Sequence, residues 1–202
     1  MSGYYKTSND VGVFGRISFL IFIVVLGIES ARQTVARLKK GRRVEELEQF
    51  ALNDSMTGMY NRNAYDYFVK NEKDFEGYVI VTFDLNNLKQ CNDQYGHRAG
   101  DEYIINAAHI IEDNFERYGK CYRIGGDEFC CIIPKGRYFK IERVMHKIDQ
   151  DVEILNHKNI IPVPVGIAYG YAVFTADDTD PEKVRERADE DMYRNKKAMK
   201  QS

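Results

Sequence analysis

The chain is poor in the cysteine patterns that mark zinc sites and disulfide frameworks. Its four cysteines are Cys91, Cys121, Cys130 and Cys131, and none belongs to a C-x-x-C motif or to a Cys/His set with zinc spacing. Cys130 and Cys131 are adjacent in a predicted strand, where neighbouring side chains point to opposite faces. The pattern argues against both kinds of site and favours a reduced, intracellular domain.

The chain also lacks a large net charge, and its C-terminal part has no internal repeat or low-complexity tract. The formal net charge is -2, with 44% hydrophobic and 30% charged residues, which is a globular composition. This balance offers no overall attraction to nucleic acid, so we expect no nucleic-acid partner and only local binding of anions. A length of 202 residues fits one domain with an appendage, and we predict that residues 53–202 form the domain.

No apolar run is long enough by itself to cross a bilayer. The run "ISFLIFIVVLGI" at 17–28 has twelve residues, whereas a membrane helix needs about 20. Extending the run back to Val11 gives eighteen residues but includes Arg16, whose charge would have to reach an interface. We predict that residues 1–28 are an N-terminal apolar segment and that residues 11–28 are a possible membrane anchor. A cleaved signal peptide is disfavoured, because the chain that follows has a cytosolic character.

Basic residues follow the apolar run closely, which by the positive-inside rule keeps the C-terminal part in the cytoplasm, tethered to the inner face of the cell membrane. The alternative is that they form a solvated helix face. Residues 29–52 have helical composition and predict a connecting signalling helix that could pair with a copy of itself. Gly41 interrupts its apolar pattern, so no stable coiled coil is predicted. The basic residues are Arg32, Arg37, Lys39, Lys40, Arg42 and Arg43.

Helical and strand patterns alternate through the predicted domain, which indicates an α/β or α+β layer fold with one hairpin. A buried strand with apolar residues on both faces ends at Asp84 and is followed by a stretch dense in polar groups. The predicted elements are helix 61–71, strand 78–84, helix 96–117, strands 121–124 and 129–133, helix 138–156, strand 163–174 and helix 181–200.

The stretch "YRIGGDEFCCII" at 122–133 places Asp127 and Glu128 at the tip of the predicted hairpin. A strand that ends in Asp84 beside this tip could bring three carboxylates together, and hard divalent cations prefer oxygen ligands. Magnesium commonly fills its remaining positions with water and substrate phosphates, which favours a nucleoside triphosphate as ligand. The alternative is an ordinary turn, because acidic turn residues are usually just solvated.

Four motifs in order make residues 50–200 resemble the GGDEF-domain family of diguanylate cyclases. The family's signature stands unchanged at 125–129. "DSMTGMYNR" at 54–62 is similar to the opening motif, with Met56 where the family has Leu. "FDLNNLKQCNDQYGHRAGD" at 83–101 and "ADEDMYRNKK" at 188–197 are the others. Four matches in the expected order make the resemblance specific.

The resemblance implies an α+β fold with a central, mostly antiparallel sheet flanked by helices, like the palm of polymerases and nucleotidyl cyclases. The implied reaction is the condensation of two GTP into cyclic di-GMP with release of two pyrophosphates. It implies two Mg²⁺ (or Mn²⁺) ions per active site and attack of a ribose 3'-hydroxyl on an α-phosphate. Each domain would hold one GTP, so catalysis would require a homodimer.

The resemblance also assigns roles to residues. Asp84 and Asp127 would be metal ligands, with the backbone carbonyl of Leu85, and Asp127 would assist deprotonation of the 3'-hydroxyl. Asn92 and Asp101 would recognise guanine, since a carboxylate accepts from hydrogens on N1 and N2 that adenine does not offer. The catalytic set is Asp127, Glu128, Asp84 and Lys89. The remaining substrate-binding residues are Gly125, Gly126, Asn87, Leu88, Lys196 and Lys200, of which Lys200 stands where many members have Arg.

The chain departs from the family at the product-inhibition motif R-x-x-D. The matching positions hold Glu116 and Gly119, so no intact inhibitory site of that kind is expected, and Arg117 would project about 100° away on a helix. We interpret Asp54, Arg62 and Arg123 as structural residues and His97 as a helix-start or packing residue.

Two alternative functions remain open. One is a catalytically silent regulatory module that binds GTP, and the other is a cyclase that makes a mixed adenine–guanine dinucleotide. The regulatory module is disfavoured because the acidic and lysine residues of the site are retained, namely Asp84, Asp127, Glu128, Lys89 and Lys196. The mixed dinucleotide is disfavoured because Asp101 at the base-reading position favours guanine.

Overall fold

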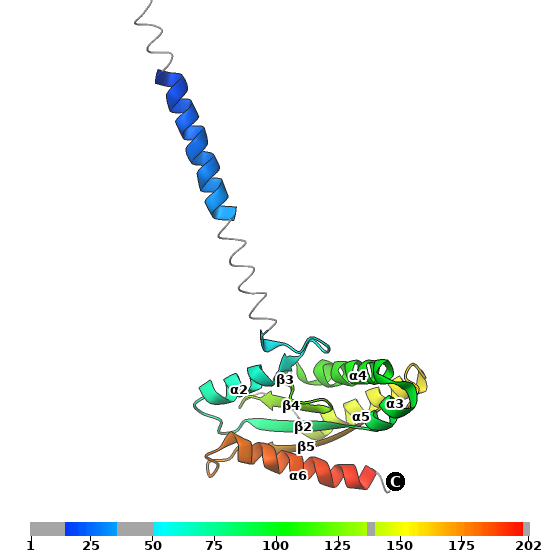
Figure 1. The fold of residues 1–202 in the computed structure, drawn as a ribbon. Coiled ribbons are helices and arrows are strands. Elements are labelled where there is room, and N and C mark those ends of the chain that lie inside the picture. The colour runs from blue at the N-terminus through cyan, green and yellow to red at the C-terminus, as the bar shows by residue number, and fades with distance from the viewer. Residues whose placement is uncertain (1–14, 36–50, 137–139, 200–202) are drawn as a thin grey trace, which may run out of the picture. The chain divides into compact units, whose positions relative to one another are not determined.

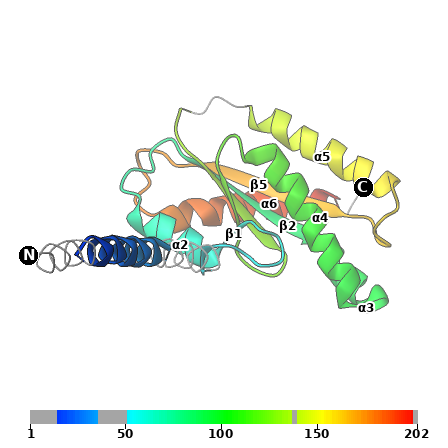
Figure 2. The ribbon, with the colours of Figure 1, turned by 90° about the horizontal axis from the view of Figure 1, so that it is seen from above.

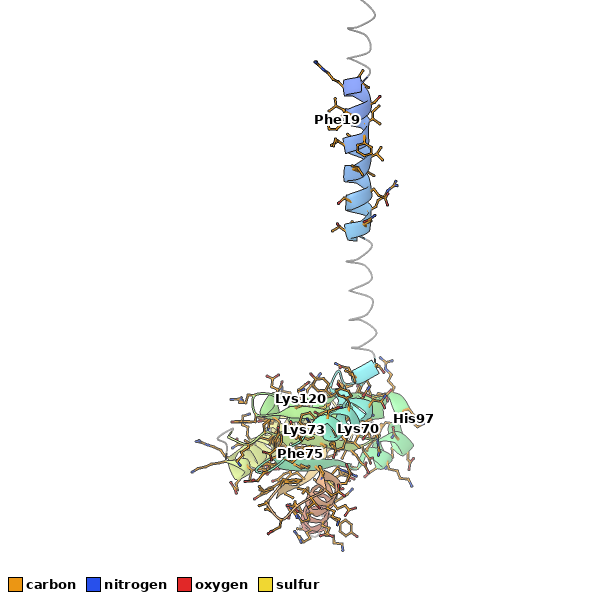
Figure 3. All side chains as sticks on the ribbon, turned by 90° about the vertical axis from the view of Figure 1, so that its left-hand side faces the viewer. Phe19, Lys70, Lys73, Phe75, His97 and Lys120 are labelled. Atoms are coloured by element: carbon orange, nitrogen blue, oxygen red, sulfur yellow. The ribbon has the colours of Figure 1, made fainter. Side chains whose placement is uncertain are left out.

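The structure is a computed structural model that describes residues 15–35, 51–136 and 140–199. The chain divides into two compact units, residues 1–49 and residues 50–202. The described part of the first unit is a single helix, Gly15–Val35, of 21 residues. Its apolar side chains, including Phe19 labelled in Figure 3, are exposed to solvent. A helix of this length is about 30 Å long, which matches the hydrocarbon core of a bilayer.

This helix starts before the predicted apolar run and continues through residue 28 without a break. The helix is long and apolar enough to cross a membrane, and a signal sequence near an N-terminus has the same length and composition. The predicted connecting helix 29–52 falls partly on residues 36–50, which lie outside the described residues.

The second unit contains a five-stranded sheet in the order β1-β3-β4-β2-β5 (Figure 1). Only the β1–β3 pair is parallel within this sheet, and the other three pairs are antiparallel. The predicted mostly antiparallel sheet flanked by helices is confirmed. The strands are β1 Tyr60–Asn61, β2 Val79–Asn86, β3 Lys120–Arg123, β4 Glu128–Ile133 and β5 Gly166–Val173.

Helices cover both faces of the sheet. α2 (Arg62–Asn71) and α6 (Pro181–Met199) pack on one face, where Ile80 of β2 and Cys130 of β4 contribute to the core. α4 (His97–Phe115) and α5 (Ile141–His157) pack side by side on the other, over Phe83 and Cys131 (Figure 2). Both faces of β2 are therefore buried, as its continuous apolar sequence predicts.

The separation of Cys130 and Cys131 onto opposite faces is also confirmed, and all four cysteines of the chain are buried, free thiols. Burial raises the pKa of the Cys130 thiol well above its usual range.

The structure departs from the predicted elements in several places, and one of them is that β2 continues two residues past Asp84 to Asn86. α3 (Leu88–Tyr95) lies in the polar stretch after Asp84, where no helix was predicted. α4 ends at Phe115, two residues earlier than predicted, so Arg117 lies in the turn that follows and the argument from a helical projection does not apply to it. β1 was not predicted, because a two-residue strand has no detectable alternation.

The start of α4 agrees with the interpretation of His97, which is the first residue of that helix (Figure 3). Its side chain is exposed. His97 is thus a helix-start residue and does not belong to the packed core.

α6 lies directly on the backbone of β5 at Gly170. A Cβ atom added to Gly170 would lie 2.0 Å from the backbone nitrogen of Met192 and 2.4 Å from the carbonyl oxygen of Ala188. Such distances are far shorter than any normal contact, so the two main chains can approach this closely only because position 170 has no side chain.

We therefore expect Gly170→Ala to lower the free energy of unfolding by about 1–3 kcal/mol, the usual cost of forcing an extra carbon into a packed region. Urea unfolding followed by circular dichroism measures the change. Gly126→Ala is the control, because a Cβ at position 126 meets nothing within 4 Å. Equal stability of the two variants would show that α6 can shift away from β5 at no cost.

Candidate active site

The acidic residues identified in the sequence meet where β2 and β4 pair. Asp84 lies directly opposite Glu128 in the antiparallel register, so both side chains leave the sheet on the same face. One residue further, the backbone N–H of Leu85 donates to the carbonyl oxygen of Asp127 over 3.1 Å. The backbones of Asp84, Asp127 and Glu128 thus meet at one position on the sheet, although the predicted cluster of three carboxylates does not form among the described residues.

The turn before Glu128 is closed by its own backbone. The N–H groups of Ile124 and Gly125 both donate to the carbonyl oxygen of Glu128, over 2.9 and 3.3 Å. A Cβ at Gly125 would come within 3.2 Å of a Glu128 carboxylate oxygen, whereas Gly126 faces open space. Glycine at 125 thus lets the Glu128 side chain fold back against the turn.

Arg123 holds the same turn by hydrogen bonds to two of its carbonyl groups. Its Nε atom donates to the carbonyl oxygen of Gly125 over 3.2 Å, and one terminal nitrogen donates to that of Gly126 over 2.8 Å. The other terminal nitrogen contacts the carboxylate of Asp54 over 2.9 Å. Because the guanidinium group is planar and rigid, it fixes both glycine carbonyls relative to Asp54.

Asp54 is in turn held by its own loop. Its carboxylate accepts hydrogen bonds from the backbone N–H of Thr57 (2.9 Å) and from the Thr57 hydroxyl (2.8 Å). Burial alone would raise the pKa of Asp54, but the hydrogen bonds from Arg123 and Thr57 outweigh burial and hold that pKa below its usual value. The structural role predicted for Asp54 and Arg123 agrees with these contacts. Among the described residues, Arg62 forms a long, exposed ion pair with Asp66, in which nitrogen and oxygen are 3.9 Å apart.

A lysine from α6 reaches the acidic group on the face of the sheet that α6 covers. Lys196 donates from Nζ to a carboxylate oxygen of Asp84, and both side chains are about one-fifth exposed. Sequence analysis placed Lys196 in the site, but it did not pair it with Asp84. Lys200, the other predicted lysine of this segment, lies outside the described residues.

The turn between β2 and α3 leaves the start of α3 without a side-chain cap. Asn87 adopts the left-handed conformation, with φ of 64°, and its side chain does not cap α3. The first N–H groups of a helix have no partner within the helix, so they can bind an anion. Leu88 is buried and anchors the turn, while Lys89 is exposed beside it.

The two residues expected to recognise the base lie on neighbouring helices. Asn92 of α3 packs against Gly100 of α4, where an added Cβ would be 2.0 Å from the Asn92 side-chain oxygen. Asp101 follows directly and is exposed in the first two turns of α4. The packing of α3 against α4 (Figure 2) therefore places the Asn92 side chain against the residue directly before Asp101.

The donor set fits a hard divalent cation. The set expected from the sequence is the carboxylates of Asp84 and Asp127 with the carbonyl of Leu85, which are oxygen donors of the kind that Mg²⁺ and Mn²⁺ prefer. Among the described residues, no three His, Cys, Asp or Glu side chains gather closely enough to hold a metal by themselves.

A pocket of about 300 Å³ adjoins this site between the β2–β4 pair and α6. Glu128 lines it together with Asp189, Arg185 and Tyr193. Burial raises the pKa of Asp189, and Arg185, 3.3 Å away, partly opposes that shift. Sequence analysis did not single out Asp189, although it lies inside the motif at 188–197.

Comparison with known proteins identifies the domain. A family model described as "Diguanylate cyclase, GGDEF domain" matches residues 51–202. The bifunctional diguanylate cyclase/cyclic di-GMP phosphodiesterase MucR of Pseudomonas aeruginosa is 31% identical over 147 residues, which is 68% of this chain and 22% of MucR. Diguanylate cyclase DgcS of Shewanella oneidensis is 28% identical over 158 residues, which is 75% of this chain and 52% of DgcS. The chain spans only a fifth to a half of the length of these relatives.

Solved structures share the fold. The coiled coil and GGDEF domain of DgcB from Caulobacter crescentus, in complex with c-di-GMP, superposes with a TM-score of 0.71 at 23% identity, covering 86% of this chain and 95% of that one. Diguanylate cyclase SiaD of Pseudomonas aeruginosa, in complex with its activator SiaC, gives a TM-score of 0.63 at 22% identity, covering 96% and 79%. At these identities the likeness concerns the fold.

The Asp54 carboxylate gives a prediction for the dependence of stability on pH. A carboxyl group whose pKa is lower in the folded protein stabilises the fold above its unfolded pKa, and this stabilisation is lost as pH falls through the folded pKa. We expect Asp54→Asn to lower the free energy of unfolding by about 1–3 kcal/mol at pH 7, and by progressively less below about pH 4.

Urea unfolding at pH 7, 4 and 3 measures this difference. Asp113→Asn is the control, because it removes a carboxylate from an exposed position of α4 and leaves the hairpin untouched. A difference between wild type and Asp54→Asn that stays constant over this range would contradict the role given to the ionised carboxylate.

Proposed function

The chain belongs to the GGDEF-domain diguanylate cyclase family, and from this premise we propose that it condenses two GTP molecules into cyclic di-GMP, releasing two pyrophosphates. The observation that carries the proposal is the pairing of Asp84 with Glu128, beside an Asp127 whose turn is clamped by Arg123. A site for phosphoryl transfer needs carboxylates fixed relative to one another, and this arrangement fixes them through backbone contacts.

Asp84, the carbonyl of Leu85 and Asp127 would hold two Mg²⁺ or Mn²⁺ ions, with Glu128 beside them. When bound, such ions neutralise charge on the phosphates and favour ionisation of the attacking hydroxyl. Asp127, at the end of the turn, would accept the proton from the ribose 3'-hydroxyl. The ion pair of Lys196 with Asp84 supports the proposal, because it shows that the Asp84 carboxylate is within reach of a cation.

The triphosphate would lie at the start of α3. The uncapped N–H groups near Asn87 and Leu88 suit the oxygens of the β- and γ-phosphates. Lys89 and Lys196, with Lys200 by position in the sequence, would add positive charge, while Gly125 and Gly126 let the backbone approach the substrate. This division of tasks lets the main chain position the phosphates and the lysines balance their charge.

Asn92 and Asp101 would select guanine. A carboxylate at Asp101 can accept hydrogen bonds from N1 and N2 of guanine, and adenine offers no equivalent donors there. Sites that rely on such hydrogen bonds reject analogues strongly, since the wrong base leaves a polar group without its partner. This residue favours cyclic di-GMP over a mixed dinucleotide as the product.

Each domain would bind one GTP, so the two phosphodiester bonds form between two copies of the domain placed face to face. The 3'-hydroxyl of each GTP would attack the α-phosphate of the other. With Glu116 and Gly119 in place of the Arg and Asp of the R-x-x-D motif, we propose that product inhibition through that motif is absent. Control of activity would then rest on how often two domains meet.

The N-terminal unit would set that encounter. Its apolar helix suits a membrane anchor at the inner face of the cell membrane, with the catalytic domain in the cytoplasm. Two domains tethered to one surface, and joined by paired connecting helices, experience a high effective concentration of each other. A regulatory module without catalysis would use the same anchor, and only an activity measurement separates the two.

We expect the purified full-length chain, incubated with GTP and Mg²⁺ or Mn²⁺, to form cyclic di-GMP at a rate that rises more steeply than linearly with protein concentration. Asp84→Asn and Asp127→Asn should each lower this rate at least about 100-fold, as loss of a catalytic carboxylate commonly does. Chromatography of the nucleotides measures the product.

Asp113→Asn is the matched control, because it removes an exposed carboxylate from α4 without touching the site. GTP binding by the wild type with no product at any concentration would replace the enzymatic proposal with the regulatory module.

The membrane anchor is tested by charge insertion. We expect the double substitution Val24→Arg, Val25→Arg to move the protein from the membrane fraction to the soluble fraction of cells, since each arginine at a bilayer centre costs about 2.5–3.5 kcal/mol. Gln33→Arg, near the end of the same helix, should leave the distribution unchanged. A protein that stays in the soluble fraction without substitution would refute the anchor.

A further inference from the structure

Tyr103 of α4 forms a hydrogen-bonded bridge between the ends of two strands. Its hydroxyl donates to the carbonyl oxygen of Asn86, the last residue of β2, and accepts a hydrogen bond from the backbone N–H of Gly166, the first residue of β5, over 2.7 Å. A weaker contact joins the hydroxyl to the carbonyl oxygen of Pro164 at 3.3 Å. One side-chain oxygen thus ties three elements together.

The bridge is buried, and the Tyr103 hydroxyl that forms it keeps its proton at physiological pH. The Tyr103 side chain is fully shielded from solvent. Burial raises its pKa to about 12, and the hydrogen bond from Gly166 opposes that shift only in part. The hydroxyl therefore stays protonated and continues to donate to Asn86.

The far side of the bridge is also rigid. Asn156 of α5 clamps the residue before β5, because its side-chain amide donates to the carbonyl oxygen of Val165 over 2.9 Å and its side-chain oxygen accepts from the N–H of Val165 over 2.7 Å. Gly166 and Asn86 are direct partners in the sheet, and a Cβ at Gly166 would lie only 3.1 Å from the Cβ of Asn86. Tyr103 is therefore bonded to a fixed point on β5.

The bridge lies next to two parts of the candidate site. The anchored carbonyl belongs to the residue directly before Asn87, whose left-handed backbone turns the chain into α3. On its own helix, Tyr103 follows Asp101 by two residues. One side chain thus connects the turn proposed for the phosphates with the helix proposed to recognise the base.

We propose that Tyr103 is a positioning residue, which sets the distance and angle between the turn at residues 86–88 and Asp101, and so matches the site to the length of a guanosine triphosphate. This proposal rests on the proposed function. Tyr103 touches neither reacting atom. It acts through the carbonyl of Asn86, and the ring alone cannot perform this task.

Tyr103→Phe removes the hydroxyl and keeps the ring that packs in the core. The carbonyl of Asn86 then loses this donor and the N–H of Gly166 loses this acceptor, so the turn gains access to other conformations. The conformation of the turn that binds the ligand is then less populated, and the apparent affinity for the ligand falls in proportion to that population. We expect the KM for GTP of the full-length variant to rise about tenfold, with kcat changed less than about threefold.

Tyr65→Phe is the matched control. Tyr65 is buried to a similar degree and also loses one hydroxyl contact, a 3.2 Å hydrogen bond to Glu182, but it lies on α2 in the other core cluster. A purely structural loss lowers the fraction of folded enzyme, which reduces apparent kcat and leaves KM unchanged. Tyr65→Phe should therefore show no rise in KM.

Amide hydrogen exchange of the ligand-free proteins supplies a second measurement, which does not depend on catalysis. We expect exchange at residues 87–89 to become faster in Tyr103→Phe and to stay at the wild-type rate in Tyr65→Phe. Unchanged KM together with unchanged exchange would overturn the positioning role. Faster exchange in Tyr103→Phe, combined with a wild type that neither binds nor converts GTP, would retain the bridge as an anchor of the turn and would refute its use for GTP, so the two proposals fail separately.

Discussion

The candidate site depends most on the contact between Arg123 and Asp54. Arg123 stands at the end of β3, and Asp54 lies in the loop where the domain begins, 69 residues earlier. One guanidinium group joins that loop to both glycine carbonyls of the hairpin turn. Without it, the turn would still have its two backbone hydrogen bonds to Glu128 and the one from Leu85 to Asp127, but no side chain would hold the carbonyl groups of Gly125 and Gly126. The geometry of the acidic residues is therefore decided by a side chain that is not expected to touch the substrate.

The same principle recurs at the other parts of the site. The turn after β2 is held by Tyr103 from α4, Asn92 is held by its contact with Gly100, and Lys196 is brought to Asp84 by α6. In each case a group on one element is fixed by a neighbour that is distant in sequence or belongs to another element. Such support is what a site needs if its polar groups are to remain in place without a ligand.

Apolar continuity in β2 and turn chemistry at Gly125 are local signals, and they predicted the two-sided burial of β2 and the meeting of Asp84 with the hairpin. The mostly antiparallel sheet was implied by the family resemblance. Sequence analysis missed α3, whose two buried residues, Leu88 and Cys91, give too short a pattern to indicate a helix. The pairing of Lys196 with Asp84 spans 112 residues and depends on how α6 crosses the sheet. The role of Tyr103 was equally hidden, since a tyrosine in a helix ordinarily indicates only packing.

The close approach of α6 to β5 at Gly170 also bears on how this domain tolerates sequence drift. Main chain rests on main chain there, one helical turn before Lys196. The position of the Lys196 backbone is therefore set by contacts between main-chain atoms, which are the same for every residue type. It depends less on the sizes of the surrounding apolar side chains. Substitutions can accumulate beneath α6 while the reach of its amine toward Asp84 is preserved, provided that position 170 remains glycine.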